Sequence, residues 1–150
     1  MGKICCFAGH STLNNEEEIR KELSAVAEKL IVSEGVTEFL VGNYGAFDRL
    51  ASGCIRKLKV KYQNVELNLT IPYLVSKEKM TPENYDNIIM ADIPEKTPRK
   101  IRIIKCNEYM VDSSDFLICY VRFTWGGAYK TLEYAERKKS AAIINLAEGS

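Results

Sequence analysis

The 150-residue chain has the composition of an ordinary globular domain, with 46% hydrophobic and 27% charged residues. Its 21 lysines and arginines balance 20 aspartates and glutamates, so a net charge of +1 provides no overall field for nucleic acid or an anionic membrane. No apolar stretch approaches the ~20 residues of a membrane span, and the start of the chain lacks a signal-peptide layout. We expect one cytoplasmic domain over residues 1–150 that has no membrane partner. Nucleic acid is unsupported as a partner.

The cysteines indicate buried thiols. They are odd in number, form no C-x-x-C pair and lie mostly within apolar runs, which does not suit disulfides or zinc. Because the chain has one histidine, His10, we expect neither a metal site nor a cofactor. The five cysteines are Cys5, Cys6, Cys54, Cys106 and Cys119.

The chain begins with a buried strand and a helix. Residues 3–8 form a continuous apolar run, typical of a central strand, which ends in a small-residue turn. Asn15 with Glu18 three residues later resembles a capping box, which predicts a helix that stops at Gly35. The turn between strand and helix consists of Gly9, His10 and Ser11.

A second strand over residues 39–41 runs into a second glycine-bearing loop that opens a second helix. Residues 65–71 then alternate between apolar and polar types, the pattern of a half-exposed strand, and we expect this strand at the edge of the sheet. The second loop supplies Gly42, Asn43, Tyr44, Gly45 and Asp48 as candidate ligand contacts.

Residues 72–98 contain all four prolines and only one short apolar run, at 87–91. Loops of this length in compact domains tend to be functional or mobile, so we expect an insertion and hypothesise a lid over the site. Thr97 as N-cap and Pro98 at the first helical position predict a third helix. This helix carries the most basic cluster of the chain, which either meets phosphates or is solvated surface.

A glycine pair follows the most apolar run of the chain. Residues 116–121 predict a strand buried on both faces, and a helical pattern begins directly after Gly126 and Gly127. A helix N-terminus leaves backbone N–H groups unpaired and partly positive, and glycines let an anion approach them. This arrangement predicts a phosphate site; the alternative is a turn that only packs the helix onto the sheet.

Alternating strands and helices predict a three-layer α/β domain with a mostly parallel sheet. The first and fourth strands are the most apolar and should be adjacent at the centre, while residues 141–146 supply a fifth strand, giving the order 3-2-1-4-5. Ligands of such sheets bind beyond the carboxyl ends of the strands at the switch point. Three glycine loops should converge there, which favours the phosphate interpretation.

Four motifs together resemble, in order and spacing, the small stand-alone SLOG proteins. That superfamily includes the SMF/DNA-processing protein A fold and the LOG phosphoribohydrolases. The resemblance covers nearly the whole chain and implies a Rossmann-like fold, a nucleotide or nucleotide-derived ligand, and a homodimer or larger assembly. The motifs are Cys-Cys-Phe-Ala-Gly-His at 5–10, Gly-Asn-Tyr-Gly-Ala-Phe-Asp at 42–48, Asn-Glu-Tyr-Met-Val-Asp-Ser-Ser-Asp at 107–115 and Gly-Gly-Ala-Tyr-Lys-Thr-Leu-Glu-Tyr-Ala at 126–135.

The resemblance carries over to the catalytic residues only in part. LOG enzymes, which cleave the N-glycosidic bond of a nucleoside monophosphate, use P-G-G-x-G-T-x-x-E and an arginine on the preceding helix. Gly126, Gly127 and Glu133 match that pattern, but Cys106 stands at the arginine position and cannot supply a guanidinium fork. This weakens the hydrolase hypothesis unless Lys105 or Arg102 takes the role. The further departures are Trp125, Tyr129 and Lys130 in place of the proline, third glycine and threonine, although Thr131 resembles the threonine of the stand-alone group.

We therefore carry three functional hypotheses: a nucleotide-sensing protein without turnover, a LOG-like hydrolase, and a DNA-associated or oligomerising protein. In an enzyme Glu133 would stabilise the ribosyl cation or activate water and His10 would assist; otherwise Glu133 complements the helix dipole and His10 is a turn residue. Tyr44 or Trp125 would stack on the base, although Trp125 fits a core position equally well. The remaining expected ligand contacts are Gly9, His10, Ser11, Gly42, Asn43, Gly45, Asp48, Asn107, Gly126, Gly127, Ala128, Lys130 and Thr131.

Overall fold

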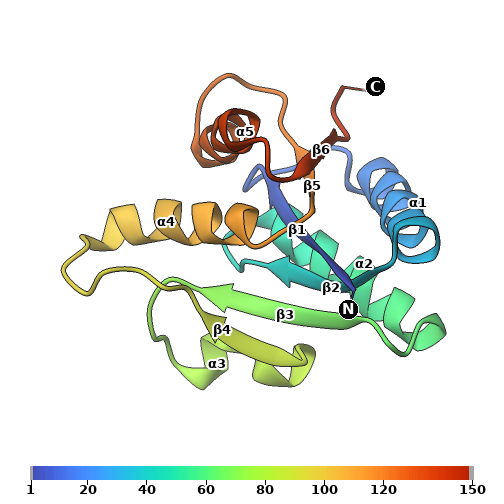
Figure 1. Ribbon diagram of the computed structural model, residues 1–150, viewed down its shortest axis with the longest axis horizontal. Coiled ribbons are helices and arrows are strands. Elements are labelled where there is room, and N and C mark those ends of the chain that lie inside the picture. Colours follow the sequence, from blue (N-terminus) through green and yellow to red (C-terminus); the bar gives the residue numbers. More distant parts are fainter. Residues whose placement is uncertain (1, 149–150) are drawn as a thin grey trace.

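The computed structural model describes residues 2–148 as a six-stranded sheet with helices on both faces (Figure 1). All adjacent strands pair in parallel, in the order β4-β3-β2-β1-β5-β6. The strands are β1 (Lys3–Gly9), β2 (Val36–Val41), β3 (Glu66–Ile71), β4 (Asn87–Met90), β5 (Phe116–Tyr120) and β6 (Ala142–Asn145). The expected α/β class and the order of the five expected strands are confirmed, with β4 added beyond β3.

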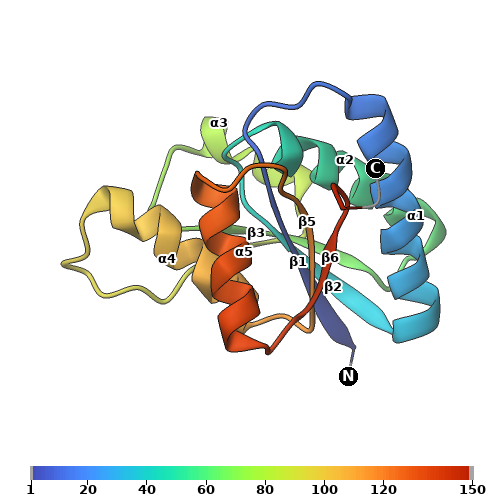
Figure 2. The ribbon, with the colours of Figure 1, turned by 90° about the horizontal axis from the view of Figure 1, so that it is seen from above.

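The helices form two layers, and the strands separate α1 and α2 from α4 and α5 (Figure 2). The core on the α1 and α2 side includes Phe7, Phe39 and Phe47, whereas Leu117 and Cys119 belong to the core under α4 and α5. No helix within residues 2–148 is both long and apolar enough to cross a membrane. The helices are α1 (Glu16–Glu34), α2 (Ala46–Lys61), α3 (Lys77–Met80), α4 (Arg99–Asp112) and α5 (Gly127–Lys138), with a 3-10 turn, η1, at Pro82–Asn84.

The expectation that residues 65–71 form an edge strand is wrong. β4 pairs with β3 on its outer side, and β3 is buried from Leu67 to Ile71. Of the alternating polar residues, Asn68 is satisfied by neighbouring strands, because it donates to Glu38 (2.8 Å) and accepts from Asn87 (3.0 Å), whereas the buried hydroxyl of Thr70 has no hydrogen-bond partner among the described residues. A polar residue in an alternating pattern therefore lies inside the sheet.

The segment 72–98 is not a structureless insertion, because it contains α3, η1 and β4. Arg102 of α4 fixes both ends of this segment by donating hydrogen bonds to the carbonyls of Pro72 (2.9 Å) and Pro94 (3.0 Å). Asn43 donates to the carbonyl of Lys79 (3.1 Å) and holds α3 against the loop after β2. The short apolar run at 87–91 is too brief to distinguish a strand from a loop by its sequence.

The helices end at or next to the predicted residues, but some of the contacts at their ends differ from those expected. α1 ends at Gly35 in the left-handed conformation (φ 76°), as expected. Asn15 is the N-cap residue of α1, but its side chain accepts from the hydroxyl of Tyr120 (3.4 Å) instead of capping the helix. Pro98, not Thr97, occupies the N-cap of α4, one residue later than expected.

Lys139, which ends α5, adopts the left-handed conformation (φ 58°) that glycine tolerates best. We expect Lys139→Gly to raise the free energy of unfolding by about 0.5–1 kcal/mol, because it removes the contact between Cβ and the following carbonyl. Urea denaturation of both proteins measures the change. Lys138→Gly, one residue earlier and inside the helix, is the matched control and should lower stability by about 1 kcal/mol. Equal effects of the two substitutions would contradict this account of Lys139.

Candidate functional site

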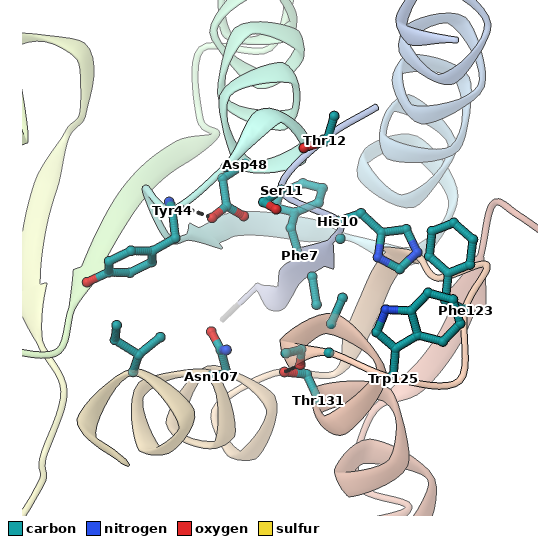
Figure 3. Close-up of a pocket in the computed structure, with 17 residues that line it drawn as sticks. Phe7, His10, Ser11, Thr12, Tyr44, Asp48, Asn107, Phe123, Trp125 and Thr131 are labelled. Atoms are coloured by element: carbon teal, nitrogen blue, oxygen red, sulfur yellow. Dashed lines mark hydrogen bonds between the residues drawn. The ribbon is translucent and has the colours of Figure 1, made fainter. Parts of the chain in front are cut away.

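A cavity of about 370 Å³ lies where the loops after β1, β2 and β5 meet, beyond the carboxyl ends of the central strands (Figure 3). The structure thus brings together the three glycine loops that the sequence placed at one edge. Twelve of the expected contacts line this cavity: Gly9, His10, Ser11, Tyr44, Gly45, Asp48, Asn107, Trp125, Gly126, Gly127, Ala128 and Thr131.

The start of α5 forms one wall of the cavity. Gly126 has a backbone φ of 92°, which residues other than glycine rarely adopt. Gly127 is the first residue of α5. Within residues 2–148, the N–H groups of Gly127, Ala128 and Tyr129 have no hydrogen-bond acceptor. A Cβ added at Gly127 would meet nothing within 4 Å. The wall therefore presents unpaired amides of residues that line the cavity, with open space beside Gly127.

The start of α2, by contrast, has its amides already occupied. The N–H of Ala46 donates to the carbonyl of Ser11 (2.9 Å), and the N–H of Phe47 to that of His10 (3.4 Å). A Cβ at Gly45 would lie 2.5 Å from the Cα of Ser11, so this glycine permits close packing of two loops. The glycine loop after β2 therefore serves packing at its helix start, and the unpaired amides are at α5.

Asp48, in the first turn of α2, is a carboxylate in the wall of the cavity. One of its oxygens accepts the N–H of Tyr44 (3.0 Å), as Figure 3 shows. Burial raises the pKa of Asp48 from its ordinary value of 3.8 to about 6, because the charged form loses water, and Arg49 only partly opposes this. Tyr44 lines the cavity beside it and is 42% exposed.

Three aromatic rings form a ledge on another side of the cavity. Phe123 and Trp125 stack with ring centroids 4.6 Å apart, and His10 lies 4.9 Å from Phe123 (Figure 3). Trp125 is 66% exposed, which excludes the core position that its sequence context also allowed. We call His10, Phe123 and Trp125 the aromatic ledge.

His10 is held in a defined orientation by its ring nitrogen. Its Nε2 accepts a hydrogen bond from the backbone N–H of Arg122 (2.9 Å), so Nδ1 carries the hydrogen of the neutral ring. Partial burial and the charge of Arg122 lower the pKa of His10 below its ordinary value. The ring is therefore a neutral member of the aromatic ledge at pH 7.

Four expected contacts lie outside this cavity. Lys130 and Glu133 line a neighbouring cavity of about 230 Å³ between α4 and α5. Gly42 is buried, and the side chain of Asn43 donates a hydrogen bond to the carbonyl of Lys79. Thr131 lines both cavities. Its hydroxyl donates its hydrogen to the carbonyl of Gly127 (3.0 Å), so this hydrogen is not available to a ligand.

The basic cluster of α4 contributes no arginine to the cavity. Arg102 is bound to backbone carbonyls, and Lys105 pairs with Glu108 (3.3 Å). Cys106 is buried, and this burial raises the pKa of its thiol to about 12. Neither of the residues considered as substitutes for the LOG arginine therefore faces the cavity. No residue of 72–98 lines it either, so this segment does not cover it as a lid.

The sequence analysis missed several cavity residues: Phe7, Ala8, Thr12, Ile103 and Phe123. Phe123 lies two residues before Trp125 in the same loop, and its position there was the available indication of a paired stacking surface. The apolar members belong to elements expected only to build the core. Within the part of the chain that the structure describes, no three histidine, cysteine or acidic side chains gather closely enough to hold a metal ion.

Comparison with solved structures identifies the architecture. The chain resembles DNA processing protein A from Helicobacter pylori, a protein described as binding single-stranded DNA, with a TM-score of 0.65 and 12% identity. The fold is Rossmann-like. The match covers 94% of this chain, which spans 64% of the length of that protein.

One comparison of sequences also finds a relative. The chain is 25% identical over 141 residues to an uncharacterized SPbeta prophage-derived protein, YoqJ, of Bacillus subtilis (strain 168). The match covers 80% of this chain and 81% of that protein. No family model matches the chain.

Proposed function

We propose that this protein binds a nucleotide or a nucleotide-derived molecule, with a phosphate at the start of α5. The observation that carries the proposal is that Gly127 and Ala128, whose amides are unpaired, line the cavity, with open space beside Gly127. These amides point the partial positive charge of a 12-residue helix at the cavity. An anion there would accept the hydrogen bonds of these amides, for which no described residue provides an acceptor.

The aromatic ledge gives the same ligand a place for its base. Trp125 and Phe123 are exposed and stacked on each other, and a base packed on an aromatic ring gains roughly 1–3 kcal/mol. The cavity volume of about 370 Å³ is that of a small-molecule pocket. Ledge and helix start both line this one cavity, so one molecule reaches both.

The resemblance to stand-alone SLOG proteins supports a sensing role without turnover. Gly126 and Gly127 belong to the motif behind that resemblance, and both line the cavity. Under the same resemblance we expect a homodimer or larger assembly, which light scattering would establish. The Rossmann-like fold agrees with this ligand class.

The LOG-like hydrolase is the second candidate, and its residues are placed less favourably. Glu133 lines the neighbouring cavity rather than the large one, and Cys106 is buried at the arginine position. The two cavities share Asn107, Gly127 and Thr131, so a ligand at the shared wall could still reach Glu133. Release of free base is the observation that would favour this candidate.

Binding of single-stranded DNA is the third candidate. The similar DNA processing protein A, described as binding single-stranded DNA, favours it against our expectation that nucleic acid is an unlikely partner. Exposed aromatic rings suit stacking of successive bases. Against it stand the net charge of +1 and the carboxylate of Asp48 in the cavity wall, because phosphodiester chains require a positive groove. We therefore favour a single nucleotide over single-stranded DNA as the ligand.

One plate separates these candidates. The midpoint of thermal unfolding is measured in the presence of nucleoside monophosphates, NAD, ADP-ribose or a single-stranded oligonucleotide. The contents of each well are then analysed by chromatography for free base. A ligand at about 100 times its dissociation constant stabilises by roughly 2.7 kcal/mol, which raises the midpoint by about 5–10 °C. We expect a mononucleotide or ADP-ribose to give this shift without base release. A shift with the oligonucleotide alone would contradict the proposal, and base release would select the hydrolase.

A further inference from the structure

Asp48 is a charged side chain in the cavity wall without an ionic partner. The backbone N–H of Tyr44 donates a hydrogen bond to one of its carboxylate oxygens (3.0 Å). No lysine, arginine or histidine among residues 2–148 forms an ion pair with it. Arg49, its neighbour on α2, is exposed; its charge lowers the pKa of Asp48 but forms no ion pair with it. A carboxylate in this setting retains unused acceptor capacity toward the cavity.

Two walls of the cavity therefore carry opposite hydrogen-bonding groups. Figure 3 shows Asp48 of α2 on one side and Thr131 of α5 on the opposite side. The α5 wall donates hydrogen bonds through its amides, whereas the Asp48 wall accepts them. A molecule that satisfies both walls carries an anionic group at one end and hydrogen-bond donors at another.

We propose that Asp48 accepts hydrogen bonds from the ribose hydroxyls of the bound nucleotide, so that the cavity selects ribonucleotides over 2′-deoxyribonucleotides. This inference rests on the proposed function, which places the phosphate at Gly127 and the base on the aromatic ledge. With those two groups assigned, the sugar is the part of the ligand left to face the third wall. Its neighbouring hydroxyls are donors, and the carboxylate can receive them at the oxygen that does not accept from Tyr44.

The other donors of a nucleotide fit this position less well. An amino group of the base lies on the edge of a ring that the ledge already holds, on another side of the cavity (Figure 3). A phosphate could not take the place of the sugar, because an unpaired carboxylate repels it in a partly dehydrated wall. Burial raises the pKa of Asp48, in keeping with a carboxylate that the folded protein leaves unpaired.

The test compares AMP, GMP and CMP with their 2′-deoxy counterparts by calorimetric titration. The proteins are the wild type, Asp48→Asn and, as matched control, Asp92→Asn, which changes an exposed carboxylate outside the cavity. A hydrogen bond from one hydroxyl to a charged acceptor corresponds to roughly a ten- to hundredfold gain in affinity. We expect the wild type and Asp92→Asn to prefer at least one ribonucleotide by about tenfold or more. In Asp48→Asn the preference should fall to within about threefold, through loss of ribonucleotide affinity.

The outcomes distinguish this inference from the proposed function. Equal binding of the ribo and deoxy forms by the wild type would overturn the role of Asp48 and leave nucleotide binding intact. Retention of the full preference in Asp48→Asn would also overturn it, because another group would then recognise the hydroxyl. If the wild type binds none of the six nucleotides, the proposed function itself fails for mononucleotides, and the inference fails with it.

Discussion

Replacing Gly127 with valine is expected to weaken binding of the stabilising nucleotide by at least about 100-fold. The added side chain would occupy open space at the cavity wall beside the free amides, where a Cβ meets no protein atom within 4 Å. Losing two hydrogen bonds to a charged phosphate costs roughly 3 kcal/mol or more, and every 1.4 kcal/mol is tenfold in affinity. Calorimetric titration of the variant measures the loss.

The fold should tolerate this change, which makes the result specific. Gly127 does not have positive φ, and valine is no worse than glycine in a helix. Gly53→Val is the matched control, because Gly53 also lies in a helix with nothing within 4 Å of an added Cβ, but outside the cavity. We expect both variants to unfold within a few degrees of the wild type and only Gly127→Val to lose affinity. Unchanged affinity in Gly127→Val would contradict a phosphate site at α5.

Asp48→Asn is expected to raise the free energy of unfolding by about 1–3 kcal/mol at pH 8. The folded pKa of Asp48 is raised to about 6 from an ordinary 3.8, so ionisation favours the unfolded chain. Asparagine keeps an oxygen for the N–H of Tyr44 while removing the charge. Urea denaturation across the pH range measures the difference between the two proteins.

The pH dependence identifies the cause of this gain. Well below pH 4 Asp48 is protonated in both folded and unfolded chains, so the two proteins should differ little. The advantage of asparagine should grow as the pH rises from the unfolded pKa of 3.8 to the folded pKa of about 6, and level off above about pH 7. A difference that is constant from pH 4 to pH 8 would mean that packing, not the charge, separates the variants. Binding sites commonly retain such destabilising groups, and stabilising changes there tend to cost function.

Most of the fold was predictable from the sequence because apolar runs reflect burial directly, whereas β4 and the inner position of β3 were not predicted. The run at 116–121 gave a central strand, and its likeness to the run at 3–8 placed the two side by side, as β5 and β1 are. The same reasoning failed at residues 65–71, because polar alternation indicates water only when no side chain from another strand satisfies the polar group. Asn68 pairs with Glu38 and Asn87, contacts between segments that lie far apart in the sequence.

The candidate site was predictable in its loops but not in its details. Strand ends and glycines place Gly9, Gly45 and Gly127 at one edge by topology alone. Which helix start keeps free amides depends on a carbonyl from another loop, such as Ser11 accepting from Ala46, and periodicity carries no information about this contact. The displacement of Glu133 into the neighbouring cavity likewise depends on the rotation of α5 and not on motif spacing.

The most direct test of the proposed site is an amide ¹H–¹⁵N NMR titration of the wild-type protein with the nucleotide that stabilises it most. The account predicts that the amides of Gly127, Ala128 and Tyr129 show the largest shifts, because a phosphate would accept their hydrogen bonds. Inorganic phosphate should move the same amides more weakly, since it cannot use the aromatic ledge. Saturation by the nucleotide with these three amides unmoved, and shifts elsewhere in the protein, would contradict a phosphate site at the start of α5.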